Sequence, residues 1–111
     1  MKDQSIYLLH IRDAIGNIEE YTKEGKTNFF KDRKTQDAVI RNLEIIGEAI
    51  KNIPTSFKTQ YPDTPWREIA GMRDILIHEY FGVDIKIVWD VVEKHLPQLK
   101  HEIEELLLKN E

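Results

Sequence analysis

The chain has 111 residues, of which 41% are hydrophobic and 32% are charged, and its formal net charge is −4. This length suits one domain with a buried core and a highly charged exterior. The acidic charge argues against a general nucleic-acid coat protein, which would usually be basic, but it leaves a local site open. The chain has no cysteine, so disulfides, a thiolate nucleophile and cysteine-ligated zinc are excluded.

Neither a membrane span nor a secretory signal is expected. No stretch approaches 18 consecutive apolar residues. Arg12 and Asp13 interrupt the apolar residues that follow the N-terminus, which is unlike a signal peptide. Together with the absence of cysteine, this pattern predicts a protein of the reducing cytoplasm.

Two long helices are predicted in the first half of the chain, over residues 3–21 and 34–53. Each has a stripe of apolar residues three or four apart, which is typical of a helix with one buried face. The stripes are Leu8, Ile11, Ile15 and Ile18, then Val39, Leu43, Ile46, Ile50 and Ile53. Asp32 or Thr35 is expected to cap the second helix. Residues 25–34 are predicted as a connection that Phe29 and Phe30 anchor to the core.

Two groups of charged residues in this half leave a functional role open. The segment Lys23–Lys34 has five cationic side chains against two acidic ones, and a solvated loop is the commoner meaning of such a run. Glu44 and Glu48 are four residues apart and share a helix face. Two carboxylates at that spacing can help to bind a metal, but no histidine accompanies them, which favours ordinary exposed acids. Whether Glu48 or the Lys23–Lys34 segment contributes to a binding cleft is left undecided by the sequence.

The second half begins with a proline-rich break over residues 54–65, which Phe57, Tyr61 and Trp66 are expected to fold onto the core. Thr64-Pro65 is a favourable helix start, so a third helix is predicted over 65–81, with Gly82 as its stop. Asp84 is expected to cap a last long helix that is kinked or broken near residues 93–96, because Pro97 lacks a backbone donor. The fold predicted for residues 1–111 is therefore one all-α domain, a mostly antiparallel bundle of four to five helices.

Several kinds of chemistry are excluded by missing motifs. The chain has no glycine-rich phosphate loop and no His-Glu-x-x-His zinc helix. His10, His95 and His101 are scattered without ligand spacing, and each is expected at the surface or at the edge of the core. No metal site and no cofactor are predicted.

The segment Met72–Gly82 is harder to explain by packing, because Arg73, His78 and Tyr80 lie within an apolar, helix-prone stretch. Arginine offers a planar fork of donors that suits phosphate, and histidine can move a proton near neutral pH. On an ideal helix, positions five apart differ by about 140° and positions seven apart by about 20°. One helix therefore places Arg73 and Tyr80 on one face and His78 on another. Either the helix distorts near its end, or a second subunit supplies half of the site, as a two-fold dimer would.

Such a site could act on RNA without a metal. The arginine would stabilise charge that develops on a phosphodiester, and the histidine would take a proton from the 2′-hydroxyl or give one to the leaving oxygen. The alternative is structural: Arg73 pairs with Asp74 or Glu79, His78 caps the helix end and Tyr80 packs. From spacing alone the structural alternative is the commoner case.

The pattern Arg73-x4-His78-x-Tyr80 resembles the Arg-x4-His-x-Tyr motif of HepT-like toxins in the HEPN superfamily. Other stretches resemble the family in the same order and extend the likeness from about Tyr7 to Leu107. They are Asn42–Ala49, Pro65–Met72, and Val88-Trp89 followed by Leu96-Pro97-x-Leu99. The short motif alone is weak, whereas the ordered set is specific.

The resemblance implies an all-α HEPN domain that forms a homodimer and acts as a metal-independent RNase toxin of a toxin–antitoxin system. It assigns Arg73 and His78 as the catalytic pair and Asp74, often asparagine in the family, as a supporting polar residue. Tyr80 matches the tyrosine to which the antitoxin MntA, a minimal nucleotidyltransferase, transfers AMP. Added phosphates would bring negative charge and bulk into a site meant for RNA phosphate.

Two other hypotheses remain. The chain could be a non-catalytic helical module that binds a nucleotidyltransferase and positions its substrate, or a helical dimer whose polar motif is structural.

Overall fold

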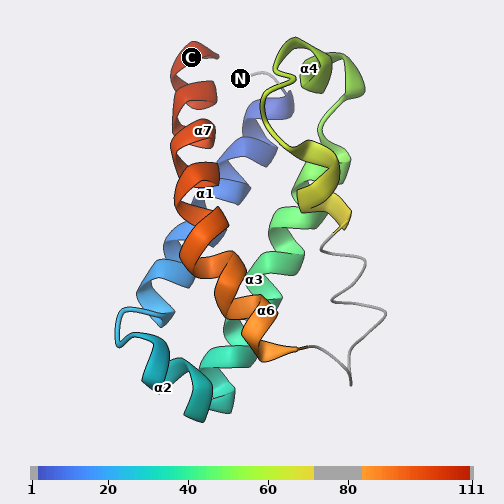
Figure 1. The fold of residues 1–111 in the computed structure, drawn as a ribbon. Coiled ribbons are helices and arrows are strands. Elements are labelled where there is room, and N and C mark those ends of the chain that lie inside the picture. The colour runs from blue at the N-terminus through green and yellow to red at the C-terminus, as the bar shows by residue number, and fades with distance from the viewer. Residues whose placement is uncertain (1–2, 72–83, 111) are drawn as a thin grey trace.

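A computed structural model describes residues 3–71 and 84–110 of the chain. The long elements are α1 (Asp3–Tyr21), α3 (Arg33–Asn52) and a last helix made of α6 (Ile85–Asp90), the π-helical segment η1 (Val91–His95) and α7 (Leu96–Lys109). Between them lie α2 (Lys26–Lys31), α4 (Thr55–Gln60) and a helical turn at residues 66–71. These described residues contain no strand, and α1 runs opposite to both α3 and α7 (Figure 1). The predicted all-α antiparallel bundle is confirmed.

The core lies where α1 packs against α3 and α7. Each helix contributes one apolar stripe, and the predicted stripes of α1 and α3 are all buried. From the last helix come Val88, Trp89, Leu96, Leu99, Ile103 and Leu106. Burial of one such side chain contributes roughly 1.5–3 kcal/mol. The interlocking stripes therefore explain why these three helices form the frame on which the shorter elements are placed.

The prediction of a plain connection over residues 25–34 is wrong, because α2 occupies most of it. Gly25 precedes α2 with φ of 91°, in the region that favours glycine, and this turns the chain out of α1. Phe29 is then fully buried, which holds α2 against the bundle. At the far end Asp32 caps α3 by accepting from the backbone N–H of Lys34 and the hydroxyl of Thr35, as predicted.

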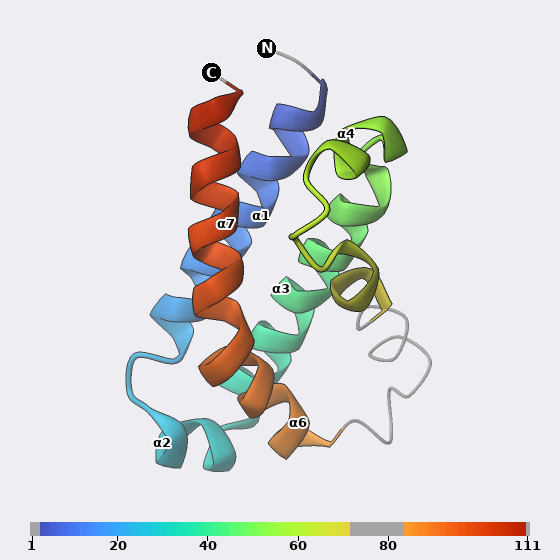
Figure 2. The same cartoon turned by 45° about the horizontal axis from the view of Figure 1, so that its top comes forward.

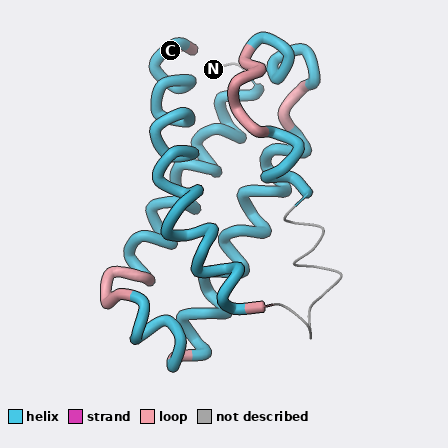
Figure 3. Tube along the Cα trace, viewed as in Figure 1, coloured by secondary structure: helices cyan, strands magenta, loops and turns pink. Residues whose placement is uncertain are grey.

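The proline-rich break separates the long helices as predicted, but it also contains a short helix, α4, that was not predicted. Pro54 sits at its N-cap, where a missing donor costs little. Phe57 and Tyr61 lie on one face with ring centroids 4.9 Å apart, and Phe57 is buried. Trp66 is buried beside Phe57, so the predicted docking of these aromatic residues onto the core is confirmed. Figure 3 shows how short the remaining loops are.

The predicted irregularity in the last helix is the π-helical segment η1. The backbone N–H of Leu96 donates to the carbonyl of Val91, five residues earlier, and Pro97 opens α7. A proline cannot donate to the carbonyl four residues before it, and its ring crowds that position. The wider π turn relieves this conflict, and α6 and α7 continue as one bent rod (Figure 2).

The two ends of the bundle differ in what they present. The start of α1 and the end of α7 lie side by side at one end, and α2 and α6 lie at the opposite end (Figures 1 and 2). Among the described residues, no helix has the length and apolarity needed to cross a bilayer.

Candidate functional site

The residues singled out by the motif, Arg73, Asp74, His78 and Tyr80, lie outside the described residues, as does Gly82. The structure instead defines the elements that lead into this segment and out of it. The chain enters from the helical turn at 66–71 and leaves at Asp84, which caps α6 by accepting from the backbone N–H of Lys86. That cap was predicted.

The entry to the motif is fixed by buried anchors. The indole N–H of Trp66 donates to the carbonyl of Tyr61 at 3.0 Å, and Thr64 is buried. The backbone N–H of Ile69 donates to the carbonyl of Pro65, which closes the first helical turn where Thr64-Pro65 predicts it. The helical turn at residues 66–71, which precedes the motif in the sequence, therefore starts from a rigid point.

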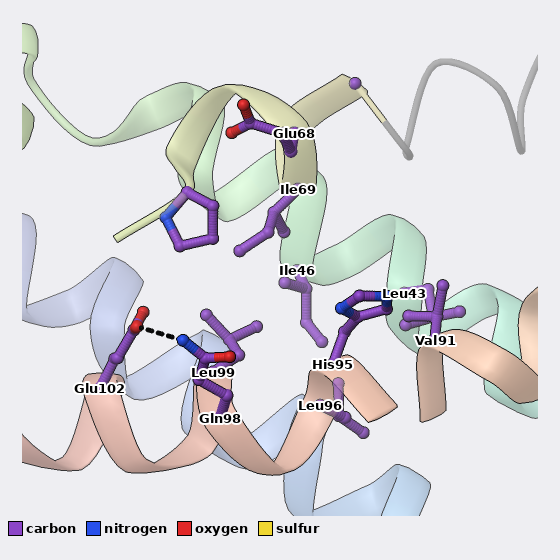
Figure 4. Close-up of a pocket in the computed structure, with 12 residues that line it drawn as sticks. Leu43, Ile46, Glu68, Ile69, Val91, His95, Leu96, Gln98, Leu99 and Glu102 are labelled. Carbon is purple, nitrogen blue, oxygen red and sulfur yellow. Dashed lines mark hydrogen bonds between the residues drawn. The ribbon is translucent and has the colours of Figure 1, made fainter. Parts of the chain in front are cut away.

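A cavity of about 590 Å³ adjoins this entry, between residues 65–71, α3 and the last helix (Figure 4). Its wall is mainly apolar and comes from Leu43, Ile46, Ile69, Val91, Leu96 and Leu99. Gly71, which also lines it, is two residues before Arg73 in the chain. The cavity thus opens where the chain passes into the proposed catalytic motif.

Polar groups line the same cavity, and sequence reasoning did not single them out as a group. Glu68, His95, Gln98 and Glu102 all belong to its lining. The side-chain N–H of Gln98 donates to Oε1 of Glu102 at 3.3 Å, while Oε2 of Glu102 is buried and has no hydrogen-bond partner among residues 3–71 and 84–110. His95 comes from the π segment, an irregularity that is frequent at functional sites. A spare carboxylate oxygen in an apolar wall is an acceptor for a donor or a cation.

The other histidines and Glu48 lie at the surface, as expected from the sequence, whereas Glu44 is half-buried. His10 and His101 are exposed, and His101 pairs with Glu105 on its own helix at 3.0 Å. Glu44 is 3.7 Å from Arg41, and Glu48 is exposed on the surface of α3. Within residues 3–71 and 84–110, no group of three or more His, Cys, Asp or Glu side chains is arranged to hold a metal ion.

A second, shallower hollow lies at the opposite end, between α2 and α6, with a volume of about 470 Å³. It is lined by Lys26, Phe30, Lys86, Trp89, Asp90, Glu93 and Lys94. Lys94 donates to Asp90 at 2.9 Å, and this hydrogen bond raises the pKa of Lys94 and lowers that of Asp90. Glu93 accepts from the indole of Trp89 at 3.3 Å. Both acids of the hollow therefore already have partners.

Comparison with known proteins identifies the family. The sequence profile of the family described as ribonuclease HepT-like matches residues 11–106. The chain belongs to this family. The matched range includes the motif segment and nearly all of the core.

Relatives and a solved structure agree with this assignment. A probable ribonuclease HepT of Thermococcus cleftensis is 55% identical over 101 residues, which cover 90% of this chain and 92% of that protein. A gamma-glutamylcyclotransferase and putative RNase of Methanocaldococcus jannaschii is 56% identical over 103 residues, or 92% of this chain. The match spans only 46% of that longer relative.

The solved structure is a tri-AMPylated Shewanella oneidensis HEPN toxin in complex with its MNT antitoxin. Its TM-score is 0.75 at 25% identity, and the alignment covers 100% of both chains. The expected resemblance to HEPN toxins is therefore confirmed for the family and for the fold.

Proposed function

We propose that this chain is the ribonuclease toxin of a toxin–antitoxin pair and that it cleaves RNA in the cytoplasm. Each chain forms one HEPN domain over residues 1–111, and two chains form the active homodimer. The observation that carries the proposal is the full-length likeness to a HEPN toxin held in complex with its antitoxin, together with membership of the ribonuclease HepT-like family. The Arg73-x4-His78-x-Tyr80 motif supplies residues suited to that chemistry.

In the proposed reaction the RNA 2′-oxygen attacks the adjacent phosphorus, and the bond from phosphorus to the 5′-oxygen of the next nucleotide breaks. His78 takes the 2′-hydroxyl proton or protonates the leaving 5′-oxygen. Arg73 stabilises the negative charge that grows on the phosphoryl oxygens. Asp74 is assigned a supporting polar role. This scheme requires no metal ion, so we propose activity in the presence of a chelator.

The dimer is part of this proposal because of helix geometry. Arg73 and His78 are five positions apart, about 140° around an ideal helix, so one copy presents them in different directions. A two-fold axis that brings two copies of the segment together could place Arg73 of one copy near His78 of the other.

Tyr80 is proposed as the point of control. A minimal nucleotidyltransferase of the MntA type would transfer AMP from a nucleoside triphosphate to the phenol oxygen of Tyr80, with pyrophosphate as the leaving group. The attached phosphate carries negative charge, which would repel RNA phosphate from the neighbouring Arg73 and His78. The AMPylated state of the similar toxin supports this mode of silencing.

The test is expression without antitoxin, combined with an RNA cleavage assay in EDTA. We expect growth arrest and cleavage for the wild type, and loss of about 100-fold or more in cleavage rate for Arg73→Ala and His78→Ala. Arg67→Ala and His101→Ala are matched controls, because both side chains are exposed and neither belongs to the Arg73-x4-His78-x-Tyr80 motif. These controls should remain toxic.

The alternative of a non-catalytic helical module gives a different result. If the wild type and both motif variants were equally harmless, and the purified wild type cut no RNA, the proposed ribonuclease function would be wrong. Binding to the nucleotidyltransferase would then become the remaining role.

A further inference from the structure

We infer that the hollow between α2 and α6 is a second contact site for single-stranded RNA, separate from the Arg73/His78 motif. This inference rests on the proposed ribonuclease function. The hollow combines an exposed aromatic ring with two lysines that have no acidic partner among the described residues, on a chain that is acidic as a whole. Backbone-tracking cations beside a stacking ring are the usual means of binding single strands.

Two cations of the hollow are available to phosphate. Among the described residues, neither Lys26 nor Lys86 has a carboxylate within ion-pair distance, whereas Lys94 is engaged by Asp90. Lys23, by contrast, is held by Glu20 at 2.8 Å. Lys26 and Lys86 are therefore available to bind phosphate, because the nearby acids Glu20 and Asp90 are already paired with other lysines.

Phe30 provides the ring. Phe30 is 37% exposed, whereas Phe29 and Phe57 are buried. The buried ring of Phe29 meets it edge to face, with centroids 5.5 Å apart, and the Trp89 ring lies 6.5 Å away. Lys26 lies 6.0 Å from the Phe30 centroid. The ring is therefore supported from behind and flanked by charge, as a base-stacking platform would require.

The position of the hollow in the chain connects it to the motif. Asp84, which caps α6, is six residues after His78, and Lys86 follows two residues later. The other wall comes from α2, which lies within the Lys23–Lys34 segment whose five cationic residues were left without a function by the sequence. In this proposal one RNA strand contacts both the motif and the hollow, because α6 begins only seven residues after His78 in the sequence.

The experiment measures binding of a fluorescent single-stranded RNA of about 20 nucleotides by anisotropy, in a His78→Ala parent and over a range of salt concentrations. We expect Lys26→Glu/Lys86→Glu to weaken binding at least about 10-fold near 100 mM salt. It should also reduce the slope of log affinity against log salt by about 1.4, because each phosphate contact in single strands contributes about 0.7. Phe30→Ala should weaken binding about fivefold or more with an unchanged slope, because stacking is not ionic.

Two matched controls test whether the position matters. Lys109→Glu removes a lysine that lies 5.8 Å from the Tyr61 ring, a similar contact at the opposite end of the bundle. Tyr21→Ala removes another exposed aromatic side chain that does not line the hollow. Both should bind RNA like the parent, and the helical circular dichroism of every variant should match the parent.

Failure of this inference can be told apart from failure of the proposed function. If the wild type cuts this RNA but Lys26→Glu/Lys86→Glu binds it no worse than Lys109→Glu, the second site is wrong and the ribonuclease stands. If that double variant loses affinity for the antitoxin and not for RNA, the hollow is a protein-binding surface and the inference is again overturned. If the wild type neither cuts nor binds RNA, both proposals are overturned.

Discussion

The side-chain amide of Asn17 on α1 donates a 3.1 Å hydrogen bond to the side-chain oxygen of Asn42 on α3. Asn42 is 6% exposed, and its own amide donates to the carbonyl of Ala38 at 2.9 Å. Both polar atoms of a buried side chain are therefore satisfied at an otherwise apolar interface. A stripe of similar aliphatic residues can slide by one turn at small cost, whereas a specific polar pair favours one register.

Asn17→Ala should lower the free energy of unfolding by about 1 kcal/mol, because it leaves the side-chain oxygen of buried Asn42 without its donor. Urea unfolding measures this loss. Asp13→Ala, an exposed change on the same helix, should stay within about 0.5 kcal/mol of the wild type. Equal effects of the two substitutions would show that the Asn17–Asn42 bond contributes nothing to stability.

Two glycines should respond to alanine with opposite signs. Gly25 has φ of 91° and ψ of −177°, a region essentially restricted to glycine, so Gly25→Ala should destabilise by about 1–3 kcal/mol. Gly16 is exposed within α1, and Gly16→Ala should stabilise by about 0.5–1 kcal/mol through helix propensity. A Cβ at either position would meet nothing within 4 Å, so backbone conformation alone sets the sign. The midpoints of thermal unfolding of both variants, compared with the wild type, test this prediction. A higher midpoint for Gly25→Ala would contradict the positive φ of Gly25 in the α1–α2 turn.

Tyr80→Phe should separate toxicity from its control. The variant keeps the ring but lacks the phenol oxygen, so it cannot accept AMP, while Arg73 and His78 remain. We expect it to stay toxic when the nucleotidyltransferase is co-expressed. Intact-mass measurement should show one or more added AMP units on the wild type and none on the variant. A wild type that is neutralised but unmodified would point to inhibition by binding alone.

The ion pair across the π segment should make a small, pH-dependent contribution to stability. The hydrogen bond from Lys94 lowers the pKa of Asp90 below its ordinary value of 3.8. This stabilisation is therefore present above about pH 4 and is lost as the pH falls through the lowered pKa of the folded state. The urea midpoints of wild type and Asp90→Asn should differ near pH 6 and converge below pH 3.8. Both side chains are largely exposed, so the difference should also shrink in high salt.

A matched control is Asp63→Asn, because Asp63 is exposed and has no ion pair among the described residues. Its midpoint difference from the wild type should not follow the same course with pH. If it did, the pH dependence would reflect net charge and not the Asp90–Lys94 pair.

The long elements could be predicted from the sequence because their signals repeat. The apolar stripes of α1 and α3 run over about three and four turns. Asp32, Asp84 and Pro97 mark boundaries by the donors they satisfy or remove. The helices α2 and α4 have six residues each, too few for a period to appear, and their neighbouring glycine and prolines suggested loops. What orders them is tertiary burial of Phe29 and Phe57.

The site divides in a similar way. The family and the motif residues Arg73, His78 and Tyr80 could be recognised in the sequence, while their roles remain predictions because they lie outside the described residues. The α2–α6 hollow could not be predicted. Lys26 and Lys86 are sixty positions apart in the chain, and tertiary packing, including that of Phe29 against Trp89, brings their helices together. Sequence patterns indicate local periodicity, and they do not predict which short helices far apart in the chain will pack together, as α2 and α6 do.

The start of α1 and the end of α7 lie at the end of the bundle opposite α2 and α6. This arrangement affects how the experiments should be set up. A purification tag, a fluorophore or a surface linker attached at either terminus would extend away from the hollow. Immobilised protein would then present its α2–α6 end to the solution, whichever terminus carries the attachment.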